Sequence, residues 1–142
     1  MYAARSTLNQ VRILHAVFLL TQFLLVFVLW LEHSPERSLA REILVAFAVV
    51  SASNVLILGG IRSRHLTAAL DILRNTPDDA AALGRWRMAN IFGFTFAESV
   101  SLFGVALKFL GAKWNVAGLF FAAGILLLLL WTPRLDLPAQ PE

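Results

Sequence analysis

The sequence predicts an all-α integral membrane protein, a four-helix transmembrane bundle that occupies the whole chain, residues 1–142, as a single membrane domain. Hydrophobic residues make up 58% of the chain and charged residues only 15%, whereas soluble domains average roughly 45–50% and about 25%. The apolar residues gather in four runs, each close to the roughly 20 residues that a helix needs to cross a bilayer. The four tryptophans fall at or near the ends of these runs, where membrane proteins place such side chains at the headgroup level.

The first two apolar runs, residues 13–31 and 43–61, predict the first two spans. The first run follows a short basic lead, as in a secretory signal, but the apolar part of a signal has only about 7–15 residues and ends in a small-residue cleavage site. Residues 13–31 are longer and end without such a site, so we expect a retained helix. Residues 32–42 form a short polar connection to the second span.

Residues 62–87 form the longest polar segment and predict a helical hairpin that extends the second and third helices out of the membrane. The first half of this segment carries apolar residues at helical spacing, at Leu66, Ala69, Leu70 and Leu73. We expect the tip of the hairpin at residues 74–77, with Thr76 as the cap of the next helix and Pro77 at its first position.

The other two runs, residues 88–107 and 114–132, predict the third and fourth spans. They are separated by a tight turn that contains Gly111. A tail of residues 133–142 contains three prolines, and we expect it to be disordered.

Four spans place both termini on the same side of the membrane, and the basic residues indicate which side. The face that carries the termini and residues 62–87 has eight arginines, and the opposite face has four basic residues. Because basic residues favour the cytoplasmic side, we expect both termini in the cytoplasm, in a bacterial-type inner or plasma membrane. Trp86 and Trp131 then mark the inner boundary, and Trp30 and Trp114 mark the outer one.

Glu98 is the only acidic residue in the four apolar runs, and it lies near the middle of the third. An ionised side chain at that depth costs about 2.5 kcal/mol or more, so Glu98 invites a functional interpretation as a site that binds H⁺ or Na⁺. Polar residues at similar depth on the first three spans predict the rest of the ion-binding cluster, namely Gln22, Ser51, Asn54, Thr95 and Ser101. Desolvation would favour a neutral, protonated carboxyl at rest.

The same residues have a structural alternative, in which polar groups and small residues only hold helices together. Gly93, Ala97 and Gly104 fall on one stripe of the third helix, and such stripes let membrane helices approach closely. Gly118 and Ala122 suggest a packing face on the fourth helix. Glu98 would then be a protonated side chain that bridges two helices at the border of this contact.

The sequence contains no motif that indicates another kind of chemistry. The chain has no cysteine, no nucleotide-binding loop, and no pair of histidines at ligand spacing. We therefore expect no enzyme activity, no metal site and no cofactor apart from a possible H⁺ or Na⁺. The net charge of +3 is expected to face anionic lipid headgroups rather than nucleic acid.

The segment Ala97-Glu98-Ser99-Val100-Ser101-Leu102-Phe103-Gly104 resembles the ion-binding helix of the c subunit, or proteolipid, of rotary ATP synthases. The hairpin tip Arg74-Asn75-Thr76-Pro77 is similar to the polar loop of that family. The resemblance implies that Glu98 is an ion-carrying carboxylate in a homo-oligomeric ring. The family's other hairpin helix carries a ladder of glycines, whereas residues 43–61 have only Gly59 and Gly60.

Two functions follow from the sequence. The first is ion- or proton-coupled transport, in which Glu98 binds and releases its ion in an oligomer whose subunit interfaces complete the pathway. The alternative is a structural or accessory subunit that packs within a larger membrane complex through Glu98 and Asn54, and docks through residues 62–87. The expected partners are therefore the lipid bilayer and either further copies of the chain or other membrane subunits.

Overall fold

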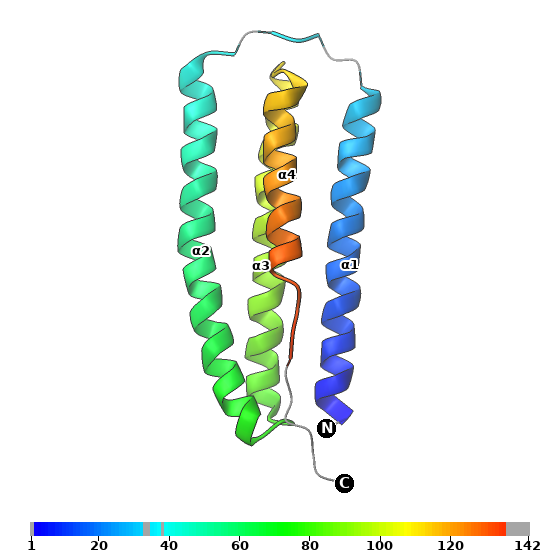
Figure 1. Ribbon diagram of the computed structural model, residues 1–142, viewed down its shortest axis with the longest axis vertical. Coiled ribbons are helices and arrows are strands. Elements are labelled where there is room, and N and C mark those ends of the chain that lie inside the picture. Colours follow the sequence, from blue (N-terminus) through cyan, green and yellow to red (C-terminus); the bar gives the residue numbers. More distant parts are fainter. Residues whose placement is uncertain (1, 33–34, 38, 136–142) are drawn as a thin grey trace.

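The computed structural model describes residues 2–32, 35–37 and 39–135, and these form four helices joined by short connections. The helices are α1 (Tyr2–Leu31), α2 (Arg41–Asn75), α3 (Ala80–Phe109) and α4 (Trp114–Leu130). Successive helices run in opposite directions, so that α1 and α3 are parallel (Figure 1). The prediction of an all-helical fold with four helices is confirmed.

Three of the helices are long and apolar enough to cross a membrane: α1, α2 and α3. Helix α4 is more apolar than these three helices but has only 17 residues. It ends at Leu130, and residues 131–135 then continue as an extended segment toward the end where α1 begins (Figure 1). The predicted tail, residues 133–142, lies outside the described residues after Leu135.

The helices extend well beyond the predicted spans at the end where α2 turns into α3. Helix α1 begins at Tyr2 rather than at residue 13, and α2 continues without interruption to Asn75. The turn between α2 and α3 comprises residues 76–79. The cap of α3 is Asp79, whose carboxylate accepts a hydrogen bond of 2.7 Å from the backbone N–H of Ala82.

The expectation that Thr76 caps α3 was therefore wrong. Thr76 ends α2 instead, because its hydroxyl and its backbone N–H both donate to the carbonyl of Ile72. This use of Thr76 moves the start of α3 three residues further along the chain than Pro77 at the first helical position would have required.

Helix α3 is the centre of the structure, because it packs against each of the other three helices. Helix α1 also touches α4, whereas α2 packs on no described helix other than α3. The main apolar cluster joins the extended ends of α1, α2 and α3, and its buried members include Val11, Leu73, Trp86 and Phe94. A smaller cluster near the opposite end joins α1 to α4 around Leu29 and Phe121.

Helices α3 and α4 approach each other closely. A Cβ added to Gly124 would lie 2.7 Å from the carbonyl oxygen of Ala97 and would overlap the hydroxyl of Ser101. A Cβ added to Gly104 would lie 2.9 Å from the carbonyl oxygen of Ala117. Only glycine therefore fits at both positions, as in other membrane helix pairs that pack through small residues.

The predicted packing residues of α3 lie at this contact or beside it, but those of α4 do not. Gly93, Ala97 and Gly104 are buried. By contrast, a Cβ added to Gly118 would meet nothing within 4 Å, and Ala122 is exposed. The buried face of α4 is rotated from the expected one and consists of Ala117, Phe121, Gly124 and Leu128.

At the other end of the bundle, the α1–α2 connection is tied to the α3–α4 turn. The backbone N–H of Arg37 donates to the carbonyl of Gly111 at 2.8 Å. Gly111 has φ +95°, a conformation that side chains disfavour, and it packs against the side chain of Arg37. Glu36 accepts a hydrogen bond from the backbone N–H of Trp114 and lies 3.9 Å from the ammonium of Lys108.

The different surroundings of two glycines on α4 give a matched test of the α3–α4 contact. We expect Gly124→Ala to destabilise the protein by about 1–3 kcal/mol, because the added methyl group cannot fit without separating the two helices. Gly118→Ala should leave the stability unchanged or slightly higher, because its methyl group enters open space. Thermal unfolding of both variants in detergent measures the difference; equal stabilities would contradict the close contact.

Candidate functional site

Glu98 lies on the face of α3 that turns toward α1. Residues four and seven positions apart share a face of a helix, so Glu98 is aligned with Phe94 on one side and Val105 on the other. The ring of Phe94 contacts the rings of His15 and Phe18 on α1, and Val105 packs in the apolar cluster that contains Leu29 of α1. Glu98 is half-buried between these contacts and forms no hydrogen bond or ion pair with any described residue.

Gln22 lies on α1 at the same depth as Glu98. The two helices are parallel and Phe18 contacts Phe94, so Gln22, four residues after Phe18, falls level with Glu98, four residues after Phe94. His15 also contacts Phe94. Because Gln22 comes seven residues after His15 and Ser101 comes seven residues after Phe94, Gln22 is also level with Ser101. Gln22 and Ser101 are both fully buried.

The polar atoms of Gln22 and Ser101 are unsatisfied among the described residues. Neither the amide nitrogen nor the amide oxygen of Gln22 has a hydrogen-bond partner, and the hydroxyl of Ser101 also has none. A buried polar group without a partner costs about 1–3 kcal/mol, and native proteins have few of them. The layer that contains Glu98 therefore holds three buried polar atoms that could accept or donate to a bound species.

The other predicted members of the cluster lie elsewhere. Ser51 and Asn54 are on α2, which packs against the opposite flank of α3, as the contact between Phe47 and Phe103 shows. Thr95 is exposed, and its hydroxyl donates to the carbonyl of Ile91 in its own helix. Gln22 and Ser101 thus lie level with Glu98, and the hydroxyl of Ser101 is directed at Gly124 in the α3–α4 contact. Ser51 and Asn54 lie on the other flank of α3, and Thr95 bonds to its own backbone.

A second polar layer, which was not among the predictions from the sequence, lies where α4 ends. The guanidinium of Arg62 donates to the side-chain oxygen of Asn90 at 3.2 Å and stacks 5.0 Å from the centre of the Trp131 ring. Its stem crosses the surface of Gly93, where a Cβ would lie 2.8 Å from Cδ of Arg62. These contacts join α2 to α3 and to the end of α4.

His15 belongs to the same layer and closes the end of α4 from the side of α1. Its Nε2–H donates to the carbonyl of Leu128 at 2.8 Å. The last four carbonyls of a helix have no partner within the helix, and Leu128 is close enough to the end of α4 to be one of them. The shortness of α4 is thus compensated by side chains from its neighbours.

The signal for this second layer was present in the sequence but weak. Asn90 is a polar residue inside the predicted third span, three positions before Gly93. Arg62 immediately follows the second span and was counted only as a loop charge. The spacing of Asn90 and Gly93 does not show which helix supplies the side chain that packs over Gly93.

Metal chemistry finds no support in the arrangement of side chains. No group of three or more potential metal ligands occurs within the described residues. The chain matches no protein-family model, no curated protein and no solved structure.

The contact between Arg62 and Asn90 can be measured by a double-mutant cycle. We expect Arg62→Met and Asn90→Leu to be coupled by about 1 kcal/mol, because each single variant leaves the other partner half-buried or buried without its hydrogen bond. Unfolding free energies of the two single variants and the double variant in detergent give the coupling. Additive effects would show that the hydrogen bond contributes nothing to stability.

Proposed function

We propose that this protein is an integral membrane protein in which Glu98 binds a proton or a monovalent cation during ion- or proton-coupled transport. The observation that carries the proposal is the buried layer of Gln22 and Ser101, whose polar atoms have no partner among the described residues and lie level with Glu98. No simple packing role accounts for an amide that is fully buried and has neither of its groups satisfied.

The chemistry of this layer suits reversible binding. The amide oxygen of Gln22, the hydroxyl of Ser101 and a carboxylate oxygen of Glu98 are all oxygen donors, and Na⁺ or a water molecule could be held among them. Alternatively, a protonated Glu98 can donate its hydrogen to one of the same oxygens. In both cases the bound species would satisfy groups that are otherwise costly to bury.

Oligomerisation is part of the proposal because Glu98 is only half-buried in one chain. Helix α1 carries large exposed apolar side chains beyond its contact with α3, including Leu20, Phe23, Leu24 and Phe27. A second copy that packs on this face and also reaches across to the exposed side of Glu98 would complete its enclosure, in keeping with the role that the resemblance to the c subunit implies for it.

We also propose the orientation predicted from the sequence, with both termini in the cytoplasm of a bacterial-type inner membrane and the α2–α3 hairpin protruding. The extent of α4 supports the protruding hairpin, because α4 ends level with Arg62 and His15 while α1, α2 and α3 continue past this level. The side of the membrane is inferred from the distribution of basic residues alone. The arginines of the hairpin would then lie in and beyond the inner headgroup region.

The second candidate function, an accessory subunit, is favoured by the packing of α2. This helix has 35 residues but buries only Ser51, Ala69 and Leu73, and it contacts a single described helix. Its exposed apolar side chains in the membrane-spanning part include Val45, Val49, Leu56 and Ile57. A partner membrane subunit could pack there, and Glu98 would then serve as a polar group that stabilises the contact between α1 and α3.

The role of Glu98 is tested by ion flux into proteoliposomes with an imposed proton or Na⁺ gradient. We expect Glu98→Gln to reduce flux at least 100-fold, since removing a transported ion's ligand costs several kcal/mol, and to leave the melting temperature nearly unchanged. Thr95→Val is the matched control, because Thr95 is on the same helix and bonds only to its own backbone. Full flux in Glu98→Gln, or co-purification of a stoichiometric partner with no flux in wild type, would favour the accessory-subunit function.

The contribution of Gln22 is tested by Gln22→Met, which keeps the volume and removes both polar atoms. If Gln22 only packs, this variant should be as stable as wild type or more stable, and the carboxyl band of Glu98 in infrared spectra should not move. If Gln22 helps to hold the ion, we expect stability to be retained while the carboxyl band shifts and flux falls about tenfold. An unshifted carboxyl band together with unchanged flux in Gln22→Met would show that Gln22 does not contribute to ion binding.

A further inference from the structure

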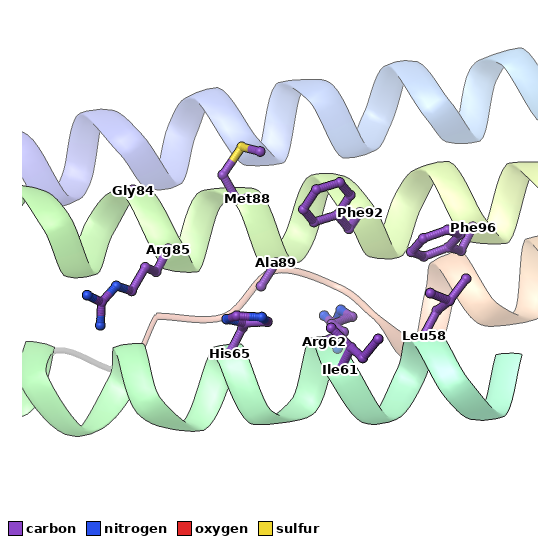
Figure 2. A pocket seen from close by; sticks show the side chains of 10 residues that line it. All are labelled: Leu58, Ile61, Arg62, His65, Gly84, Arg85, Met88, Ala89, Phe92 and Phe96. Carbon is purple, nitrogen blue, oxygen red and sulfur yellow. The ribbon is translucent and has the colours of Figure 1, made fainter. Parts of the chain in front are cut away.

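A groove with a volume of 490 Å³ runs between α2 and α3. Its walls are almost entirely apolar over most of its length, and they include Leu58, Ile61, Met88, Phe92 and Phe96 (Figure 2). His65 and Arg85 lie together at the end nearer the α2–α3 turn, and Leu58 and Phe96 lie at the opposite end. The groove is therefore amphipathic along its length.

The basic residues at this end of the groove lack acidic partners. His65 and Arg85 are exposed, and neither forms a hydrogen bond or an ion pair with any described residue. The acidic residues of the hairpin have other partners, since Asp79 caps α3 and Asp71 lies 3.5 Å from Arg74. Asp78 accepts from the backbone N–H of Ala4 on the far side of α3.

Arg62 adds a third basic side chain to the wall of the groove. One of its terminal nitrogens donates to Asn90, while Nε is buried and has no partner among the described residues. Arg62 lies level with the end of α4, and His65 lies one helical turn further toward the α2–α3 turn. The positive end of the groove therefore begins where the apolar part of the bundle ends.

We propose that this groove binds one anionic phospholipid from the leaflet at the α2–α3 end of the bundle. Its phosphate accepts hydrogen bonds from Arg85 and His65, and one acyl chain lies along Met88, Phe92 and Phe96. The charge complementarity selects an anionic headgroup, and the apolar length beyond it selects a lipid rather than a free phosphate. The site is independent of Glu98, which faces α1 on another side of α3.

The proposal is tested by lipid titration of the delipidated full-length protein, with bound lipids counted by native mass spectrometry. The probes are phosphatidylglycerol, phosphatidylcholine and inorganic phosphate. We expect one tight phosphatidylglycerol per chain, weak binding of phosphatidylcholine, and no displacement of the lipid by millimolar phosphate. The double variant His65→Gln/Arg85→Gln should weaken phosphatidylglycerol binding at least tenfold.

The control variant for charge is Arg64→Gln/Arg87→Gln, which removes basic side chains from the same two helices without touching the groove. It should change the affinity less than about twofold if the headgroup is bound specifically. An equal loss in both double variants would overturn the proposal, because it would show diffuse attraction to the basic hairpin. Displacement by inorganic phosphate would also overturn it, because the ligand would then be a free anion.

A second variant tests the groove without altering any charge. Gly84 lines the groove at its basic end, and a Cβ added there would meet nothing within 4 Å. Gly84→Leu should therefore fill the groove while leaving the fold intact or more stable, since leucine favours a helix over glycine. We expect Gly84→Leu to abolish tight binding of phosphatidylglycerol. Gly118→Leu on α4, where the added side chain also enters open space, should not affect this binding. Retention of the lipid in Gly84→Leu would place it elsewhere on the protein.

Discussion

The close approach of α3 and α4 is the constraint on which the rest of the structure depends. Gly124 and Gly104 allow the two backbones to come so near that Ser101 and the carbonyl of Ala97 are shielded from any solvent. Because lipid offers no hydrophobic force between helices, close van der Waals packing of this kind is the main attraction available. Helices α1 and α2 then occupy the two flanks of α3, and this arrangement decides which polar residues can meet.

The flanks of α3 divide the polar residues into separate sites. On the side of α1, Glu98 is level with the unpaired Gln22, and the unpaired hydroxyl of Ser101 lies at the α3–α4 contact. On the side of α2, Arg62 reaches across Gly93 to Asn90 and Trp131, and a groove with free basic residues opens next to it. The proposed ion site and the proposed lipid site therefore share a central helix but no side chain, and each can be altered without the other.

The sequence predicted the four helices because runs of apolar residues long enough to cross a bilayer are readily recognised. It did not predict the start of α1, because residues 2–12 are too polar for a span and become ordered by packing against the ends of α2 and α3. For the site, hydropathy placed Gln22, Ser51 and Glu98 at one depth but could not give the direction in which each helix faces. Direction depends on which helices become neighbours, and only the structure shows that α2 and α1 lie on opposite flanks. The roles of these residues in ion binding stay predictions.

The separation of α1 from α2 has a consequence for how the two halves of the chain depend on each other. Among the described helices, the backbones of α1 and α2 do not approach each other, and the apolar cluster to which both contribute also contains residues of α3. The contacts that hold the first two helices in the bundle therefore come mainly from the second half of the chain, from α3 for both helices, from α4 for α1 and from Trp131 for α2. A chain that ended before α3 would lack these contacts.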